Sequence, residues 1–155
     1  MDRKPFRILA IAGSLRQGSY NRGLLRAAQE VAPEWVEVQF FDIGQLPFFN
    51  EDVEAAGDPE PVRRLKDAIS TSNAVLIATP EYNGTVPGVL GRIGAIVVPD
   101  PQVLVPRASR LFDERVDLRD EGTREEIRQL VEEVAHWCRR VQPEEPVGAQ
   151  SVASS

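Results

Sequence analysis

Residues 8–21 indicate the fold class, and they read Ile8-Leu9-Ala10-Ile11-Ala12-Gly13-Ser14-Leu15-Arg16-Gln17-Gly18-Ser19-Tyr20-Asn21. An apolar run ends abruptly at Gly13 and gives way to small and polar residues. Apolar side chains then recur at helical spacing, at Leu24, Leu25, Ala28 and Val31. This order predicts a buried strand, a loop and an amphipathic helix.

The loop in this stretch has the residue types of an anion-binding site. Small residues let backbone N–H groups approach a phosphate, and the following helix N-terminus adds partial positive charge. Ser14 and Ser19 offer hydroxyl donors, and Arg16 offers a charged fork. The loop sequence matches neither the motif of a nucleoside-triphosphate loop nor the G-x-G-x-x-G dinucleotide-binding motif. We interpret it as a phosphate loop; the alternative is an ordinary strand-to-helix connection.

Composition is that of a single globular domain. The chain has 155 residues, of which 42% are hydrophobic and 27% charged, and its net charge is −6. This negative charge argues against nucleic acid and anionic membranes as general partners. Cys138 is the one cysteine, and the apolar run near the N-terminus is too short for a secretion signal or a membrane span. We therefore expect a cytoplasmic protein.

Strands and helices are expected to alternate along the chain. The strand at 7–12 is apolar on both faces, which is typical of the centre of a parallel sheet. The other predicted strands are 36–40, with the alternation of an edge strand, 74–78, which is apolar throughout and expected to be buried, and 95–98. Such alternation predicts a doubly wound α/β sheet.

Two further helices carry capping signals. Asp58 followed by Pro59 predicts a helix start, with an apolar face at Val62, Leu65 and Ile69. Thr123 and Glu126 have the spacing of a capping box for a last helix. Its expected buried stripe is Ile127, Leu130, Val131, Val134, Trp137 and Cys138. Beyond Val141 the composition predicts a disordered tail at 142–155, so that 1–141 form the domain.

A second loop, Thr79-Pro80-Glu81-Tyr82-Asn83-Gly84-Thr85-Val86-Pro87-Gly88, follows the strand at 74–78. Loops at the carboxyl ends of two parallel strands can form opposite sides of one crevice. The alternative for this segment is a solvated turn. His136 and Cys138 lie two residues apart on the last helix and do not face each other, so we interpret them as a surface histidine and a buried cysteine. No catalytic or metal-ligating cluster is predicted.

Together the two loops resemble those of the NADPH-dependent FMN reductase family, a flavodoxin-like group that includes quinone, azo-dye and chromate reductases. The residues that carry the resemblance are Gly13 to Asn21 and Thr79 to Leu90. The resemblance extends from about Arg7 to Leu90 and resumes from about Gly94 to Trp137. It implies a flavodoxin-like, three-layer, doubly wound parallel sheet.

The resemblance also implies a cofactor and a set of site residues. FMN would be bound, with its phosphate held by Ser14, Arg16, Ser19 and Asn21. The flavin ring would lie against Pro80, Glu81, Tyr82, Asn83 and Gly84. Hydride would pass from NADPH through FMN to a small acceptor such as a quinone, with no catalytic side chain required. Family members typically dimerise, so a homo-oligomer is expected.

The chain departs from the family pattern after Leu90. There the family continues its third helix and adds a strand, a flavin-facing loop and another helix, whereas this chain runs directly into the strand at 95–98. We expect a sheet truncated to about four strands, ordered second, first, third, last. Two competing functions stay open: a non-catalytic relic or interaction module, and a flavin-binding electron carrier without nicotinamide chemistry.

Overall fold

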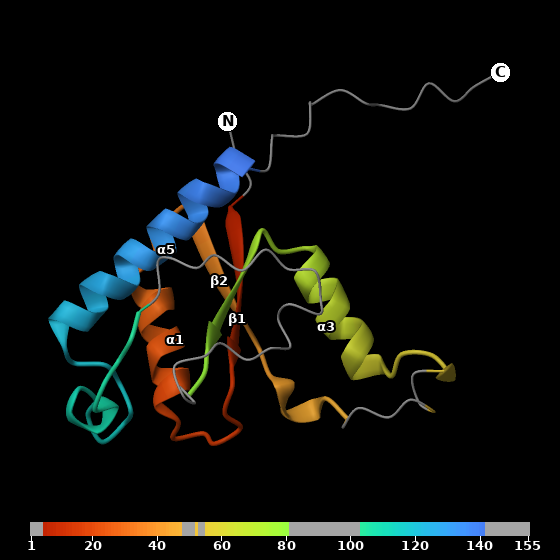
Figure 1. Cartoon of the computed structure of the whole chain (residues 1–155), viewed down its shortest axis with the longest axis horizontal. Helices are drawn as coiled ribbons and strands as arrows, with labels where there is room; N and C mark the ends of the chain where they lie inside the picture. Colours follow the sequence, from red (N-terminus) through yellow and green to blue (C-terminus); the bar gives the residue numbers. More distant parts are fainter. Residues whose placement is uncertain (1–4, 48–51, 53–54, 81–102, 142–155) are drawn as a thin grey trace.

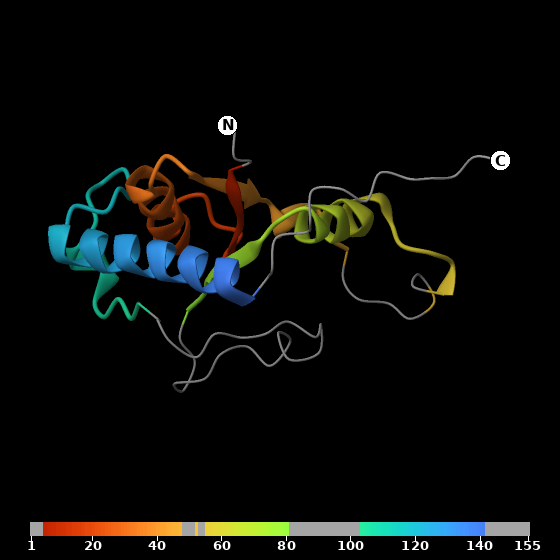
Figure 2. The same ribbon diagram turned by 90° about the horizontal axis from the view of Figure 1, so that it is seen from above.

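The computed structural model describes residues 5–47, 52, 55–80 and 103–141. Three parallel strands form one sheet in the order β2-β1-β3. Figure 1 shows helices α1 and α5 on one side of this sheet and α3 on the other, and the view in Figure 2 agrees. The bounds are Phe6–Ala12 for β1, Tyr20–Val31 for α1, Val36–Phe41 for β2, Glu60–Ser70 for α3, Ala74–Ala78 for β3 and Glu121–Val141 for α5; Ile43–Gln45 (η1) and Ala108–Arg110 (η2) are short 3-10 helices. The predicted flavodoxin-like α/β class is confirmed.

The central position of β1 is also confirmed. Ile8 lies opposite Val38 of β2 and Ala74 of β3 in the parallel register. The order of the first three strands is therefore as predicted, with β2 at one edge of the sheet that the described residues form. The predicted fourth strand at 95–98 lies outside the described residues.

The core lies between the sheet and the helix pair α1 and α5. Ile8 and Leu25 are each 2% exposed, and Val131 of α5 is 1% exposed. In β2, the buried Val36 and Val38 alternate with the exposed polar residues Glu37 and Gln39, whereas residues 8–10 of β1 are all buried. The helix stripe of α5 is buried at Thr123, Ile127, Val131, Ala135 and Cys138, while the predicted Leu130, Val134 and Trp137 are half-buried.

The prediction that the strand at 74–78 is buried is wrong. No residue of β3 is fully buried, and Val75 is 41% exposed. Within the described residues β3 pairs with β1 alone, so it has a neighbour on one side only. Helix α3 has no fully buried residue either, and Ile69 of its predicted apolar face is exposed. The α3 side of the sheet is therefore much less covered than the α1 side.

Both predicted helix caps are displaced by one to three residues. Helix α5 begins at Glu121, and Asp120 rather than Thr123 caps it: Oδ2 of Asp120 accepts from the Thr123 amide at 2.8 Å and from Oγ1 of Thr123 at 2.7 Å. These bonds lower the pKa of Asp120. Helix α3 is capped by the backbone of Pro59, and Asp58 instead pairs with Lys66 at 2.5 Å. In the described part of the chain, no helix is long and apolar enough to cross a bilayer.

Candidate functional site

The predicted phosphate loop, residues 13–19, connects β1 to the N-terminus of α1. It turns back on itself where the amide of Ser19 donates to the Arg16 carbonyl at 3.2 Å. Ser19 is the N-cap, and its Oγ accepts from the Asn21 amide at 3.2 Å. A hydroxyl that accepts one bond can still donate its proton to another acceptor. Ser19 and Asn21 thus lie close together at the N-terminus of α1.

The positive charge of Arg16 in this loop is not paired with an acidic side chain of the described residues. Arg16 is exposed, and neither Arg16 nor Ser14 makes a side-chain hydrogen bond or ion pair with another described residue. The first turn of α1 contains no acidic residue. Arg22 in the same turn pairs with Asp42 at 3.4 Å, while its buried Nε has no hydrogen-bond partner in the described chain. The arrangement suits a bound anion.

The two loops that were predicted to share a crevice begin side by side. The Gly13 amide donates to the Ala78 carbonyl at 2.7 Å. A Cβ placed on Gly13 would lie 3.1 Å from Oγ1 of Thr79, which is tighter than most side-chain contacts, so glycine suits this approach. Pro80 follows and is exposed. Of the predicted ring-contacting residues, Glu81, Tyr82, Asn83 and Gly84 lie outside the described residues.

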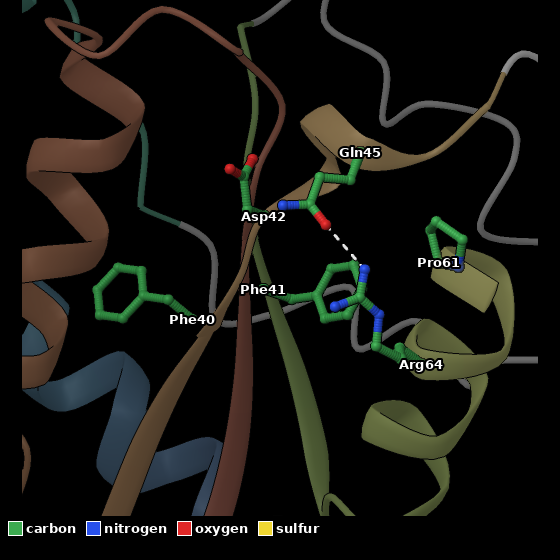
Figure 3. Close-up of a pocket in the computed structure, with 6 residues that line it drawn as sticks. All are labelled: Phe40, Phe41, Asp42, Gln45, Pro61 and Arg64. Atoms are coloured by element: carbon green, nitrogen blue, oxygen red, sulfur yellow. Dashed lines mark hydrogen bonds between the residues drawn. The ribbon is translucent and has the colours of Figure 1, made fainter.

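A pocket that the sequence analysis did not predict lies beside this site. It measures about 220 Å³ and is formed where β2 ends against η1 and α3. Figure 3 shows Phe40 pointing to one side of β2 and Phe41 to the other, with Nη2 of Arg64 donating to Oε1 of Gln45 at 2.7 Å. The lining residues are Phe40, Phe41, Asp42, Gln45, Pro61 and Arg64. Two adjacent aromatic residues at a strand end were the available sequence signal.

A second unpredicted feature is the packing of residues 111–119 against α1. A Cβ on Gly23 would lie 2.4 Å from the Val116 carbonyl oxygen, so only glycine allows this approach. Nη2 of Arg26 also donates to that oxygen at 2.7 Å. The sequence signal was a glycine inside a helical pattern, where it costs about 1 kcal/mol relative to alanine.

His136 and Cys138 occupy the positions expected of a surface histidine and a buried cysteine. Cys138 is buried, and burial raises the pKa of its thiol. A thiol with a raised pKa is a poor nucleophile at neutral pH. His136 is exposed, with Nδ1 2.8 Å from the Glu132 carbonyl oxygen. Neither residue belongs to the loop site.

Comparison with known proteins identifies the family. Residues 6–93, more than half of the chain, match the family described as NADPH-dependent FMN reductase. The chain belongs to this family. A quinone reductase from Pseudomonas putida is 47% identical over 85 residues, which are 55% of this chain and 46% of that protein. The chain thus spans about half the length of several curated family relatives that it matches.

Another family member aligns over nearly its whole length. An NAD(P)H-dependent FMN reductase from Pseudomonas aeruginosa is 32% identical over 178 residues, covering 87% of this chain and 96% of the relative. Because that alignment is longer than the chain's own 155 residues, part of the relative faces gaps in this chain. This agrees with the internal omission inferred from the family pattern.

A solved structure supports the same family fold. The flavoenzyme FerB, an NAD(P)H:(acceptor) oxidoreductase from Paracoccus denitrificans, superposes with a TM-score of 0.72. The two chains are 25% identical, and the match covers 86% of this chain and 97% of FerB.

Proposed function

We propose that this chain binds FMN and transfers hydride from NADPH or NADH to a small acceptor such as a quinone. The observation that carries the proposal is Arg16, a cation whose side chain has no partner among the described residues, in a glycine- and serine-rich loop at a helix N-terminus. In a chain of net charge −6, such a local positive site suits an anionic group. The names of its relatives, quinone reductases and an FMN reductase, support the redox assignment.

The residues of the loop fit the phosphate end of FMN. The guanidinium of Arg16 can donate two parallel hydrogen bonds to phosphate oxygens, and the hydroxyls of Ser14 and Ser19 add further donors. Ser19 and Asn21 stand at the N-terminus of α1, where the helix dipole also favours an anion. The absence of a side chain at Gly13 leaves room for the loop to pass close to Thr79.

The ring end of the proposed site starts at Pro80 and continues into Glu81, Tyr82, Asn83 and Gly84, which stay predictions. Bound FMN would supply the hydride-accepting and hydride-donating chemistry, so the protein's part is to bind, orient and exclude water. We also propose that the protein acts in the cytoplasm, as its single cysteine and short N-terminal apolar run suggest, and that it forms a homo-oligomer, as the family resemblance implies.

The visible spectrum of the purified protein tests this function. FMN is added first and NADPH second, under anaerobic conditions. We expect a yellow protein that bleaches when NADPH is added. A yellow protein that NADPH leaves unchanged would identify an electron carrier instead. A colourless protein that cannot be loaded with FMN would contradict the proposal and favour a relic or interaction module.

The relic alternative has one structural observation in its favour. β3, with Val75 exposed and its other residues only half-buried, lies at the edge of the described sheet, where the family pattern predicts a further strand. Inserting a family-type strand, loop and helix after Leu90 tests whether the omission limits the protein. We expect the insertion to strengthen FMN binding, because it adds apolar burial and backbone hydrogen bonds around the ring. Unchanged affinity and unchanged flavin reduction by NADPH would show that the omission is not limiting.

A further inference from the structure

We infer that residues 111–119, here called the clamp loop, position the phosphate loop by holding the first turns of α1. This inference rests on the proposed FMN function and extends it to residues that do not touch the proposed phosphate site. The clamp loop follows η2 and is closed by an antiparallel bridge between Phe112 and Leu118. It precedes α5 and packs on the N-terminal half of α1.

The first contact is a close approach at Gly23. A Cβ there would lie 2.4 Å from the Val116 carbonyl oxygen and 2.6 Å from Cε1 of Phe112. Tyr20 lies about one helical turn before Gly23, and the centroid of its ring is 5.0 Å from that of Phe112. The clamp loop therefore covers the first turn of α1 directly.

Arg26 provides the second contact. Its Nη2 donates to the carbonyl oxygen of Val116 at 2.7 Å and approaches Oδ1 of Asp117 at 3.2 Å. One guanidinium thus joins α1 to both the backbone and a side chain of the clamp loop. A hydrogen bond to a charged group is stronger than one between neutral groups, so Arg26 holds the clamp loop firmly against α1.

The clamp loop is organised from within by Asp113. Its Oδ1 accepts from the amides of Arg115 and Asp117 at 2.9 and 3.0 Å, and its Oδ2 pairs with Nη2 of Arg119 at 2.6 Å. Val116, between these residues, has φ 63°, a conformation that is costly for a β-branched residue. The bonds of Asp113 hold this strained turn in the shape that meets Gly23.

A short chain of contacts leads from the clamp loop to the phosphate site. Gly23, which touches the clamp loop, donates its amide to the Ser19 carbonyl at 3.2 Å, and Ser19 in turn donates to the Arg16 carbonyl at 3.2 Å. Loosening the clamp loop should therefore release the N-cap and the turn that carries Arg16. The clamp residues are positioning residues, since none of them is proposed to touch the phosphate.

The test uses Asp113→Asn in the full chain, with Asp67→Asn on α3 as a matched control. Both variants remove one negative charge, and the Asp67 side chain makes no hydrogen bond or ion pair with a described residue. FMN and riboflavin are titrated in parallel by flavin fluorescence. We expect Asp113→Asn to weaken FMN binding about fivefold, the loss of roughly one hydrogen bond, with riboflavin little changed. The control should match the wild type.

Electrostatics alone predicts the opposite sign, because removal of a negative charge should tighten FMN binding. Unchanged or tighter binding by Asp113→Asn, or equal losses for FMN and riboflavin, would overturn the inference. Amide hydrogen exchange at Ser19, Asn21 and Gly23 in flavin-free protein provides a readout that does not need FMN. We expect faster exchange there in Asp113→Asn than in Asp67→Asn, and equal rates would also overturn it.

A second variant, Gly23→Ala, places a methyl group against the Val116 carbonyl and should have a larger effect of the same kind. If the wild type binds no FMN, the proposed function fails. The exchange measurement then still decides whether the clamp loop holds the phosphate loop.

Discussion

The two sides of the sheet differ sharply in how well they are covered. On the α1 and α5 side, Leu25 and Val131 are almost completely buried. On the other side, α3 has no fully buried residue and Val75 of β3 is 41% exposed. Stability is therefore expected to come mainly from one side of this molecule. The loop at 13–19, which we propose binds phosphate, lies at the end of the sheet, so its exposed residues are available to a ligand.

The largest expected effect separates the two sides directly. Leu25→Ala on α1 should lower the free energy of unfolding by about 2–5 kcal/mol, because it leaves a cavity in a packed core. Leu65→Ala on α3 removes the same atoms from a half-buried position and should cost about 1 kcal/mol. Urea denaturation of both variants measures the difference. Equal losses would show that α3 is as well packed as α1.

Arg16→Ala tests whether the exposed arginine of the loop at 13–19 binds the phosphate of FMN. FMN binding should weaken about tenfold or more, because a charge-assisted contact contributes about 1.5–3 kcal/mol. Riboflavin affinity and the urea midpoint should change little, since Arg16 has no described partner. Parallel titrations with the two flavins measure this. An equal loss for both would mean that Arg16 supports the fold and not the phosphate.

Val116→Gly tests strain on the well-covered side. Val116 has φ 63°, which glycine adopts without a side-chain penalty. We expect the free energy of unfolding to rise by about 1 kcal/mol, the lower end of the cost of such a residue. The thermal midpoint checks it, with Gly57, at φ 110°, replaced by alanine as the converse control. A lower midpoint for Val116→Gly would contradict the strain.

The smallest expected effect is on the stability of the protein at acidic pH. The pKa of Asp120 is lowered in the folded protein by its bonds to Thr123, and that of Asp113 by bonds to the Asp117 amide and Arg119. A lowered folded-state pKa means that each carboxylate stabilises the fold above its unfolded pKa, near 3.9. This stabilisation is lost as pH falls through the folded pKa. Asp120→Asn should be less stable than the wild type at pH 7, and the difference should shrink below about pH 4.

Thermal midpoints across this pH range measure the effect. A difference that stays constant with pH would indicate that the Asp120 cap acts without its charge.

Features that depend on a local sequence pattern were predicted accurately, and features that depend on the backbone path were not. The bounds of β1, β2 and β3 were predicted to within one residue, because apolar runs and alternation depend on local pattern alone. The helix caps were misplaced because Asp120 and Thr123 are both suitable capping residues, and only the backbone path decides which one faces the free amides. Four of the nine residues of the proposed site, Glu81 to Gly84, lie outside the described residues and stay predictions.

By itself, the sequence determined the α/β class and the position of the strand-to-helix loop at 13–19, which we propose binds phosphate. Both depend on residue type and spacing along a continuous segment, whereas the order of the first three strands was predicted from the family resemblance and is confirmed by the pairing of β1 with β2 and β3. Only the tertiary structure decided that β3 is poorly covered, that Gly13 meets Thr79, and that the clamp loop packs on Gly23. Burial and close approach depend on which distant segment lies alongside, and spacing along the chain carries no information about that neighbour.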